Sequence, residues 1–98
     1  MPTKAETLLS AVTSTGAGSW INVANSRGVI VTHTASSSPD LTVAIEGKDH
    51  AGNAVALDST AISAAGDTLI QVPIGFSEIR ANVTVYTAGT LSSFLNAA

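Results

Sequence analysis

The sequence predicts an all-β protein, an antiparallel β-sandwich (Ig-like or jelly-roll-like) of about seven or eight strands. Apolar residues alternate with polar or small ones at a period of two, which is typical of strands with one face in a core. Short segments rich in Gly, Pro, Asn, Asp and Ser interrupt this pattern at the spacing of about 8–12 residues that antiparallel sandwiches show. The chain of 98 residues is long enough for one domain with a modest core.

The strands predicted from the alternation are 20–23, 29–34, 41–48, 54–58, 68–72 and 79–86. In the last of these, the residues predicted to share the buried face are Ile79, Ala81, Val83 and Val85. The segments predicted to break or turn the chain are 25–28, 36–40, 49–53, 64–67 and 73–76.

The first nineteen residues have a different composition from the rest. Ala, Glu and Leu in 4–12 favour a helix, but no convincing cap precedes them, and the flexible Thr/Ser/Gly segment 13–19 follows. We therefore predict a flexible N-terminal arm or a first strand over 1–19, followed by a β-sandwich domain over 20–98.

The segment IEGKDHAGNAVAL, residues 45–57, is rich in side chains that bind metals or protons. A calcium loop needs oxygen ligands at alternating positions, and a zinc site needs three or four ligands. Here Asp49 and Asn53 supply oxygens only at the two ends of the loop, and no third ligand is spaced to join His50. We predict no metal and no cofactor in this segment.

The same segment suits a hairpin turn between two strands. Asp49 is a residue type that hydrogen-bonds nearby backbone, and Gly52 can adopt a positive φ. Glu46, next to the core residue Ile45, is predicted to face solvent. The polar residues of 45–57 are therefore explained by a turn.

No arrangement of residues predicts catalysis. His33 lies on the predicted face of Val29, Val31 and Ala35, where a histidine is usually a core or interface residue. The sequence lacks a Gly-x-Ser-x-Gly elbow, and no Asp is placed to orient a histidine. We expect no catalytic residues and no enzymatic activity.

The composition favours a component of an assembly. Charged residues make up 11% of the chain, against about 25% in average soluble domains, and the net charge is −3. A surface of Ser, Thr and Ala can pack against a neighbouring subunit, although a secreted-type β domain low in Lys and Glu has the same composition. The four basic residues are dispersed, which argues against nucleic-acid binding.

The sequence also indicates in which cellular compartment the chain is made. No apolar run reaches the roughly 18 residues of a membrane span. The first residues, MPTKAETLLSAV, do not resemble a signal peptide, so we expect synthesis in the cytoplasm. The absence of cysteine excludes a disulfide framework.

Four aromatic residues leave two possibilities open. Tyr86, predicted to face outward, and Phe76, in a predicted loop, could form a small platform for sugar rings. Alternatively, Trp20 and Phe94 anchor the core or a subunit interface. The residues proposed for such an interface are Trp20, Ile21, His33, Tyr86, Phe94 and Leu95.

Three segments together resemble small β-sandwich virion structural proteins of tailed bacteriophages. They are LTVAIEGKD (41–49) with the turn at Gly52, STAI and AGDT (59–62 and 65–68), and EIRANVTVYTAGT (78–90). Within that group, a chain of this size looks most like a capsid decoration, or cement, protein.

This resemblance implies a binding protein and carries no catalytic residues. The expected function is to bind the outside of an assembled capsid as a dimer or trimer, bridging subunits of the major capsid protein and stabilising the shell. The arm over 1–19 would then order on the capsid or on a neighbouring subunit. Related blocks occur in tail fibres, so a glycan- or receptor-binding domain of a tail appendage stays open as the alternative.

Overall fold

The computed structural model describes residues 4–98, and every regular element in that range is a β-strand. The strands are β1 (Lys4–Val12), β2 (Gly16–Ala17), β3 (Ile21–Asn22), β4 (Val29–Lys48), β5 (Ala54–Ile62), β6 (Gly66–Val72) and β7 (Glu78–Ala97). All their pairings are antiparallel. The predicted all-β, antiparallel class is confirmed. No helix in the described range is long and apolar enough to cross a membrane.

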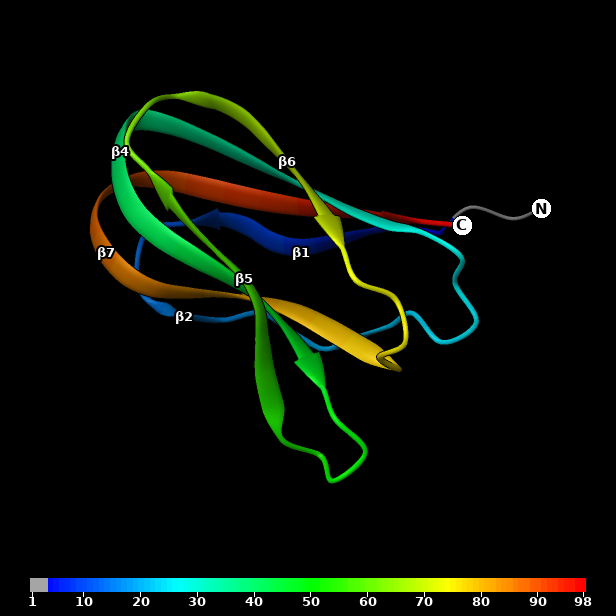
Figure 1. The fold of residues 1–98 in the computed structure, drawn as a ribbon. Helices are drawn as coiled ribbons and strands as arrows, with labels where there is room; N and C mark the ends of the chain where they lie inside the picture. Colours follow the sequence, from blue (N-terminus) through cyan, green and yellow to red (C-terminus); the bar gives the residue numbers. More distant parts are fainter. Residues whose placement is uncertain (1–3) are drawn as a thin grey trace.

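Two long strands, β4 and β7, run side by side through both layers of the fold and bend together (Figure 1). In the first layer, the start of β4 pairs with β6 and with the end of β7, which in turn pairs with β1. In the second layer, the end of β4 pairs with β5 and with the start of β7, which also pairs with β2 and β3. The sandwich is thus one sheet folded over on itself.

The fold line crosses β4 at the segment that the sequence predicts as a break. Pairing with β7 is interrupted between Ser36 and Asp40, and Ser37 and Ser38 have positive φ angles of 62° and 54°. On the facing strand, Gly89 has φ 99°, and a Cβ there would lie 2.5 Å from Cα of Pro39. The segment 36–40 therefore bends one strand instead of separating two, and Gly89 allows the two strands to approach at the bend.

The core fills the space between the two layers. The buried face predicted for the start of β4 is confirmed, because Val29, Val31, His33 and Ala35 are all buried. The remaining buried core residues include Leu41, Val43, Ile45, Ile79, Ala81, Val83, Leu91 and Leu95. This alternation makes each layer one wall of the core.

A β-bulge in β7 changes the predicted face of two residues. Val43 pairs with Val83 but Thr42 pairs with Val85, so Thr84 is an extra residue. Beyond this bulge the alternation is inverted. Val85 is 56% exposed, and Tyr86 packs against the core and donates a hydrogen bond to the Gly89 carbonyl (2.8 Å). The predictions of a buried Val85 and an outward Tyr86 are therefore wrong.

Of the two possibilities predicted for the N-terminal segment, a flexible arm or a first strand, Lys4–Val12 form a strand, β1. A second bulge lies between Thr7 and Leu9, and it allows the adjacent residues Leu8 and Leu9 both to be buried in the core. Through Leu8 and Leu9, β1 contributes to the core of the sandwich. Residues 1–3 of the predicted arm lie outside the described residues.

Candidate functional site: the two outer faces of the sandwich

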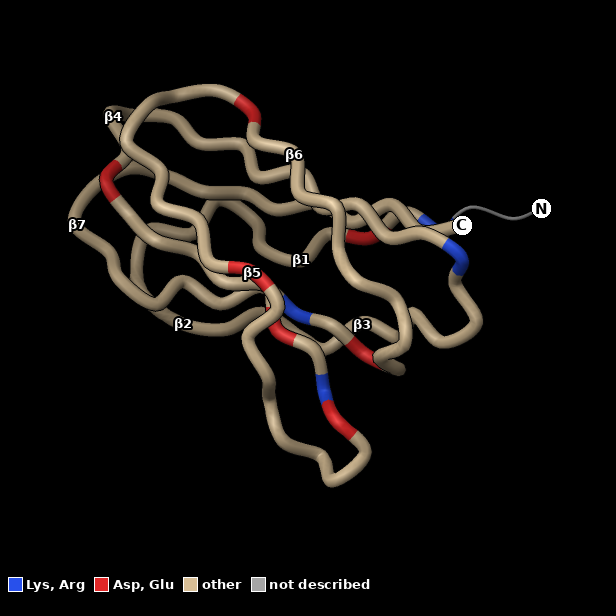
Figure 2. Tube along the Cα trace, in the orientation of Figure 1, with Lys and Arg blue, Asp and Glu red and all other residues tan. Residues whose placement is uncertain are grey.

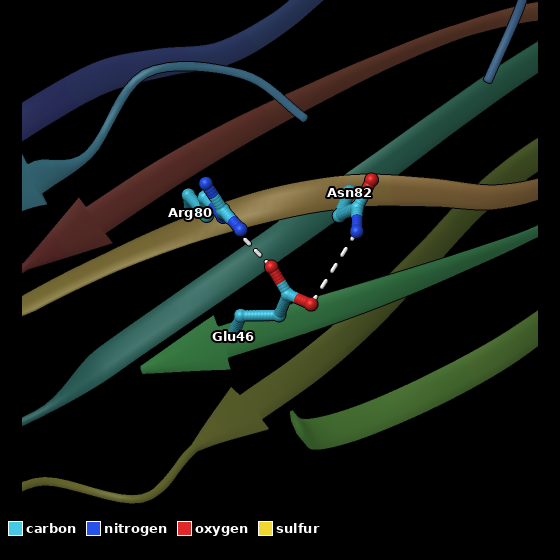
Figure 3. Close-up of polar contacts among 3 residues, drawn as sticks. All are labelled: Glu46, Arg80 and Asn82. Carbon is cyan, nitrogen blue, oxygen red and sulfur yellow. Dashed lines mark hydrogen bonds and ion pairs between the residues drawn. The ribbon is translucent and has the colours of Figure 1, made fainter. Parts of the chain in front are cut away.

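The outer face of the second layer carries a group of hydrogen-bonded polar side chains (Figure 3). The Glu46 carboxylate accepts a hydrogen bond from Nε of Arg80 at 2.7 Å and another from Nδ2 of Asn82 at 3.3 Å. The Glu46 side chain is only 15% exposed. It does point to the outer face, but the prediction that it is solvated is wrong, because cross-strand partners cover it.

Trp20 completes this polar cluster, which we define as Trp20, Glu46, Lys48, Glu78, Arg80 and Asn82. The pairing of Ile21 with Ile79 places Trp20 beside Arg80. The Arg80 guanidinium carbon lies 4.4 Å from the indole ring centre, and Nζ of Lys48 lies 4.9 Å from it. Lys48 also forms an ion pair with Glu78 at 3.0 Å. Two cations and two carboxylates balance one another, so the cluster stabilises the layer and offers no unpaired charge to a ligand.

The outer face of the first layer is apolar at its centre. Figure 2 shows that charged residues gather mainly near the hairpin of β4 and β5 and are sparse over the first layer. Leu69 is 68% exposed, Phe94 41% and Ile30 39%. Thr32 pairs with Leu69 on one side and with Phe94 on the other, and Ile30 lies two residues before Thr32. These four residues form what we name the apolar face.

The interior holds a histidine that sequence analysis placed correctly on the core face. His33 is fully buried, and its Nδ1 shares a hydrogen bond of 2.6 Å with Oγ of Ser93, which is also fully buried. Its Nε2 is buried without a hydrogen-bond partner among the described residues. Burial lowers the pKa of His33 because it disfavours the imidazolium ion, and the negative charge of Asp58 opposes this shift.

The hairpin predicted over 41–58 is confirmed. The Asp49 carboxylate accepts hydrogen bonds from the backbone N–H of Ala51 (3.0 Å) and of Asn53 (2.8 Å). Gly52 has φ 88°, and its N–H donates to the Asp49 carbonyl at 3.0 Å. The carboxylate is thus occupied by the turn itself. Among residues 4–98, no group of three or more His, Cys, Asp or Glu side chains is arranged to hold a metal ion.

Two shallow depressions lie at the end of the sandwich where the loops before β4 and β7 meet, on either side of Ile74. Their lining residues are Val23, Ala24, Asn25, Ser26, Arg27, Gly28, Val29, Gln71, Val72, Pro73, Gly75, Phe76 and Ser77. Arg27 is the one ionisable side chain in this lining. The depressions therefore lack paired acid and base groups.

The proposed interface residues do not form one surface. His33 and Leu95 are buried in the core, so neither is available to a partner. Trp20, Ile21 and Tyr86 are half-buried, and Tyr86 packs against the core. Only Phe94 lies on the apolar face.

The sequence analysis did not identify Ile30 and Leu69 as exposed apolar residues. Each occupies the outward position of a predicted strand, next to inward-facing neighbours. A large apolar residue at an outward position is the signal that could have identified both.

No protein-family model matches this chain, and no curated protein matches it. The chain is similar to a solved structure described as the crystal structure of SPBc2 prophage-derived protein YomS. The TM-score is 0.78, and the match covers 99% of this chain and 94% of that chain. The two sequences are only 17% identical, so the likeness is evidence for a common fold and for nothing more specific. The chain thus shares a complete β-sandwich architecture with that protein.

Proposed function

We propose that this chain is a non-enzymatic structural protein of a phage virion, which binds the outside of an assembled capsid as an oligomeric decoration protein. The observation that carries the proposal is the likeness of fold, over nearly the whole of both chains, to a protein described as prophage-derived. The sequence resemblance to small virion sandwich proteins rests on different observations and points to the same source.

The chemistry of the surface supports a binding role. The two carboxylates and two cations of the polar cluster are paired with one another, and the carboxylate of Asp49 is held by the turn. By contrast, Ile30, Leu69 and Phe94 are exposed apolar side chains on one outer face of the sheet. Covering exposed apolar side chains with a binding partner removes them from water and lowers the free energy.

The glycan-binding alternative requires exposed aromatic rings that can stack on sugars. Trp20 is in contact with two cations, Tyr86 packs against the core, and Phe76 packs against Gly47. Phe94 is then the one large exposed aromatic among the described residues. No observation favours this alternative, and it becomes an outcome of the test.

The test is co-sedimentation of the purified chain with empty capsids assembled from the major capsid protein of the same genome. We expect saturable binding at a fixed ratio of copies to capsid subunits and a higher temperature of capsid disruption. An unbound chain at saturating concentration would overturn the proposal. Specific hits on a glycan array, together with no capsid binding, would favour the tail-appendage function instead.

A further inference from the structure

We infer that the apolar face is a self-association site, and that its occupant is the same face of a second copy related by a twofold axis running along the start of β4. The inference rests on the proposed function, because it describes how a decoration protein would form its oligomer. The self-association itself is a property of the isolated chain and can be measured without a capsid.

The strand register makes this face self-complementary. A twofold axis lying between two packed faces and parallel to β4 brings β4 against β4 and exchanges β6 with β7. Because Leu69 and Phe94 flank Thr32 in one row, Leu69 of each copy then meets Phe94 of the other, and Thr32 meets Thr32. Ile30 meets its own equivalent. The three apolar side chains of each copy, Ile30, Leu69 and Phe94, therefore all meet apolar side chains of the other copy.

The polar rows on either side match as well. In one neighbouring row Gln71 and Asn96 flank Ile30, so the axis places each Gln71 amide opposite an Asn96 amide. In the other row Asp67 and Ser92 flank Thr34, so each Asp67 carboxylate faces a Ser92 hydroxyl and not a second carboxylate. Amides pair with amides and a carboxylate accepts from a hydroxyl. Two packed sheets are usually rotated by about 30° relative to each other. The row of Leu69, Thr32 and Phe94 lies at the centre of this rotation, so its side chains stay opposite each other.

Charge and size define the kind of dimer expected. Asp67 is the one charged residue in these three rows, and its carboxylate already accepts a hydrogen bond from Oγ1 of Thr34 at 2.9 Å. No charge is therefore buried without a partner. Three strands about 4.8 Å apart and about six residues long at 3.3 Å each give a face of roughly 14 by 20 Å. A face of roughly 280 Å² per copy is smaller than the roughly 800 Å² per partner of a standard interface, so the dimer is expected to be weak and to dissociate on dilution.

The test is sedimentation equilibrium of the isolated chain over a wide concentration range. The wild type is expected to show a monomer–dimer equilibrium. Leu69→Glu and Phe94→Lys should each remain monomeric, because each places two charges against apolar side chains in its own dimer. A one-to-one mixture of the two variants should regain the dimer, since the introduced charges then face each other in a single contact. Val85→Glu, a comparable exposed position on the second layer, should associate like the wild type.

A cysteine substitution provides a measurement that disturbs the surface less. The chain contains no cysteine, and Thr32 lies next to the proposed axis. Treatment of Thr32→Cys with a short bis-maleimide cross-linker, which can span two sheets packed about 10 Å apart, should give a covalent dimer, and Val85→Cys should give much less. A wild type that stays monomeric near its solubility limit, a trimer, single variants that associate normally, or an unreactive Thr32→Cys would each overturn the inference. Capsid binding is measured separately, so a failure of the decoration function and a failure of this dimer are distinguishable.

Discussion

The buried His33 should make the domain sensitive to mild acid. The neutral imidazole can share its hydrogen bond with Ser93 and leave one nitrogen unpaired. The imidazolium ion must place an N–H donor at both nitrogens, and Nε2 has no acceptor among the described residues. Protonation in the folded state therefore costs both desolvation and an unmade hydrogen bond. The nearby Asp58 carboxylate offsets part of this cost.

The direction of the effect follows from the lowered pKa of His33. In the unfolded chain the imidazole titrates near its ordinary pKa of 6.5, whereas the folded chain resists protonation until lower pH. Between the two pKa values the unfolded state binds more protons, so the free energy of unfolding falls as the pH is lowered. A single titrating group can change the free energy of unfolding by at most about 1.4 kcal/mol for each pH unit between the two pKa values. For a domain of this size, each kcal/mol lowers the Tm by about 4–8 °C.

The assay is thermal unfolding followed by circular dichroism between pH 7.5 and pH 5. His33→Leu removes the titrating group, and Ser93→Ala is added so that no buried hydroxyl loses its partner. The double variant should lose the part of the pH dependence that lies just below pH 6.5, while His50→Gln, on the exposed turn, should retain it. If His33→Leu/Ser93→Ala and the wild type lose stability in parallel over this range, the reasoning about His33 is refuted.

Three further substitutions test the turn, the polar cluster and the bend. Asp49→Ala removes the acceptor of two backbone N–H groups and should lower the free energy of unfolding by about 1–2 kcal/mol in urea titrations; an unchanged midpoint would contradict the role of Asp49. Glu46→Ala should cost about 1 kcal/mol, and a double-mutant cycle with Arg80→Ala should give a favourable coupling, because the pair is partly shielded from solvent. Gly89→Ala should cost more than about 2 kcal/mol, because it combines a positive φ with a backbone clash. Gly28→Ala, with open space at Cβ, serves as its control, and equal melting temperatures would show that the bend tolerates a side chain.

Local patterns of the sequence identified most strands, because alternation and turn chemistry act over a few residues. The turn at Asp49 and Gly52 shows this most clearly, since both the predicted hydrogen bonds and the predicted positive φ are present. The sequence pattern does not predict a strand over the final part of β7, although Leu91, Ser93, Leu95 and Ala97 alternate as buried residues. The serine in that run interrupts an otherwise apolar pattern, and its burial is explained only by its hydrogen bond to His33.

The bends and bulges could not be read from the sequence, because they depend on how two distant strands fit together. The segment around Pro39 reads as a loop, and only its contact with Gly89 shows that it is a fold line within one long strand. Likewise, nothing local marks Thr84 as an extra residue. The consequence is a change of side for Val85 and Tyr86, since an insertion of one residue inverts the faces that follow.

These irregularities also explain why the residues proposed for an interface do not lie on one surface. The predicted interface assumed that aromatic residues mark an exposed patch, but the bulge turns Tyr86 toward the core and the cross-strand register sets Trp20 beside Arg80 and Lys48. The apolar face instead arises from Leu69 and Phe94, which are 25 residues apart in the chain and meet only because β6 and the end of β7 both pair with the start of β4. Such a surface exists only because the strand register brings these side chains into one row. Its function must therefore be tested by substitutions that change one row of side chains at a time.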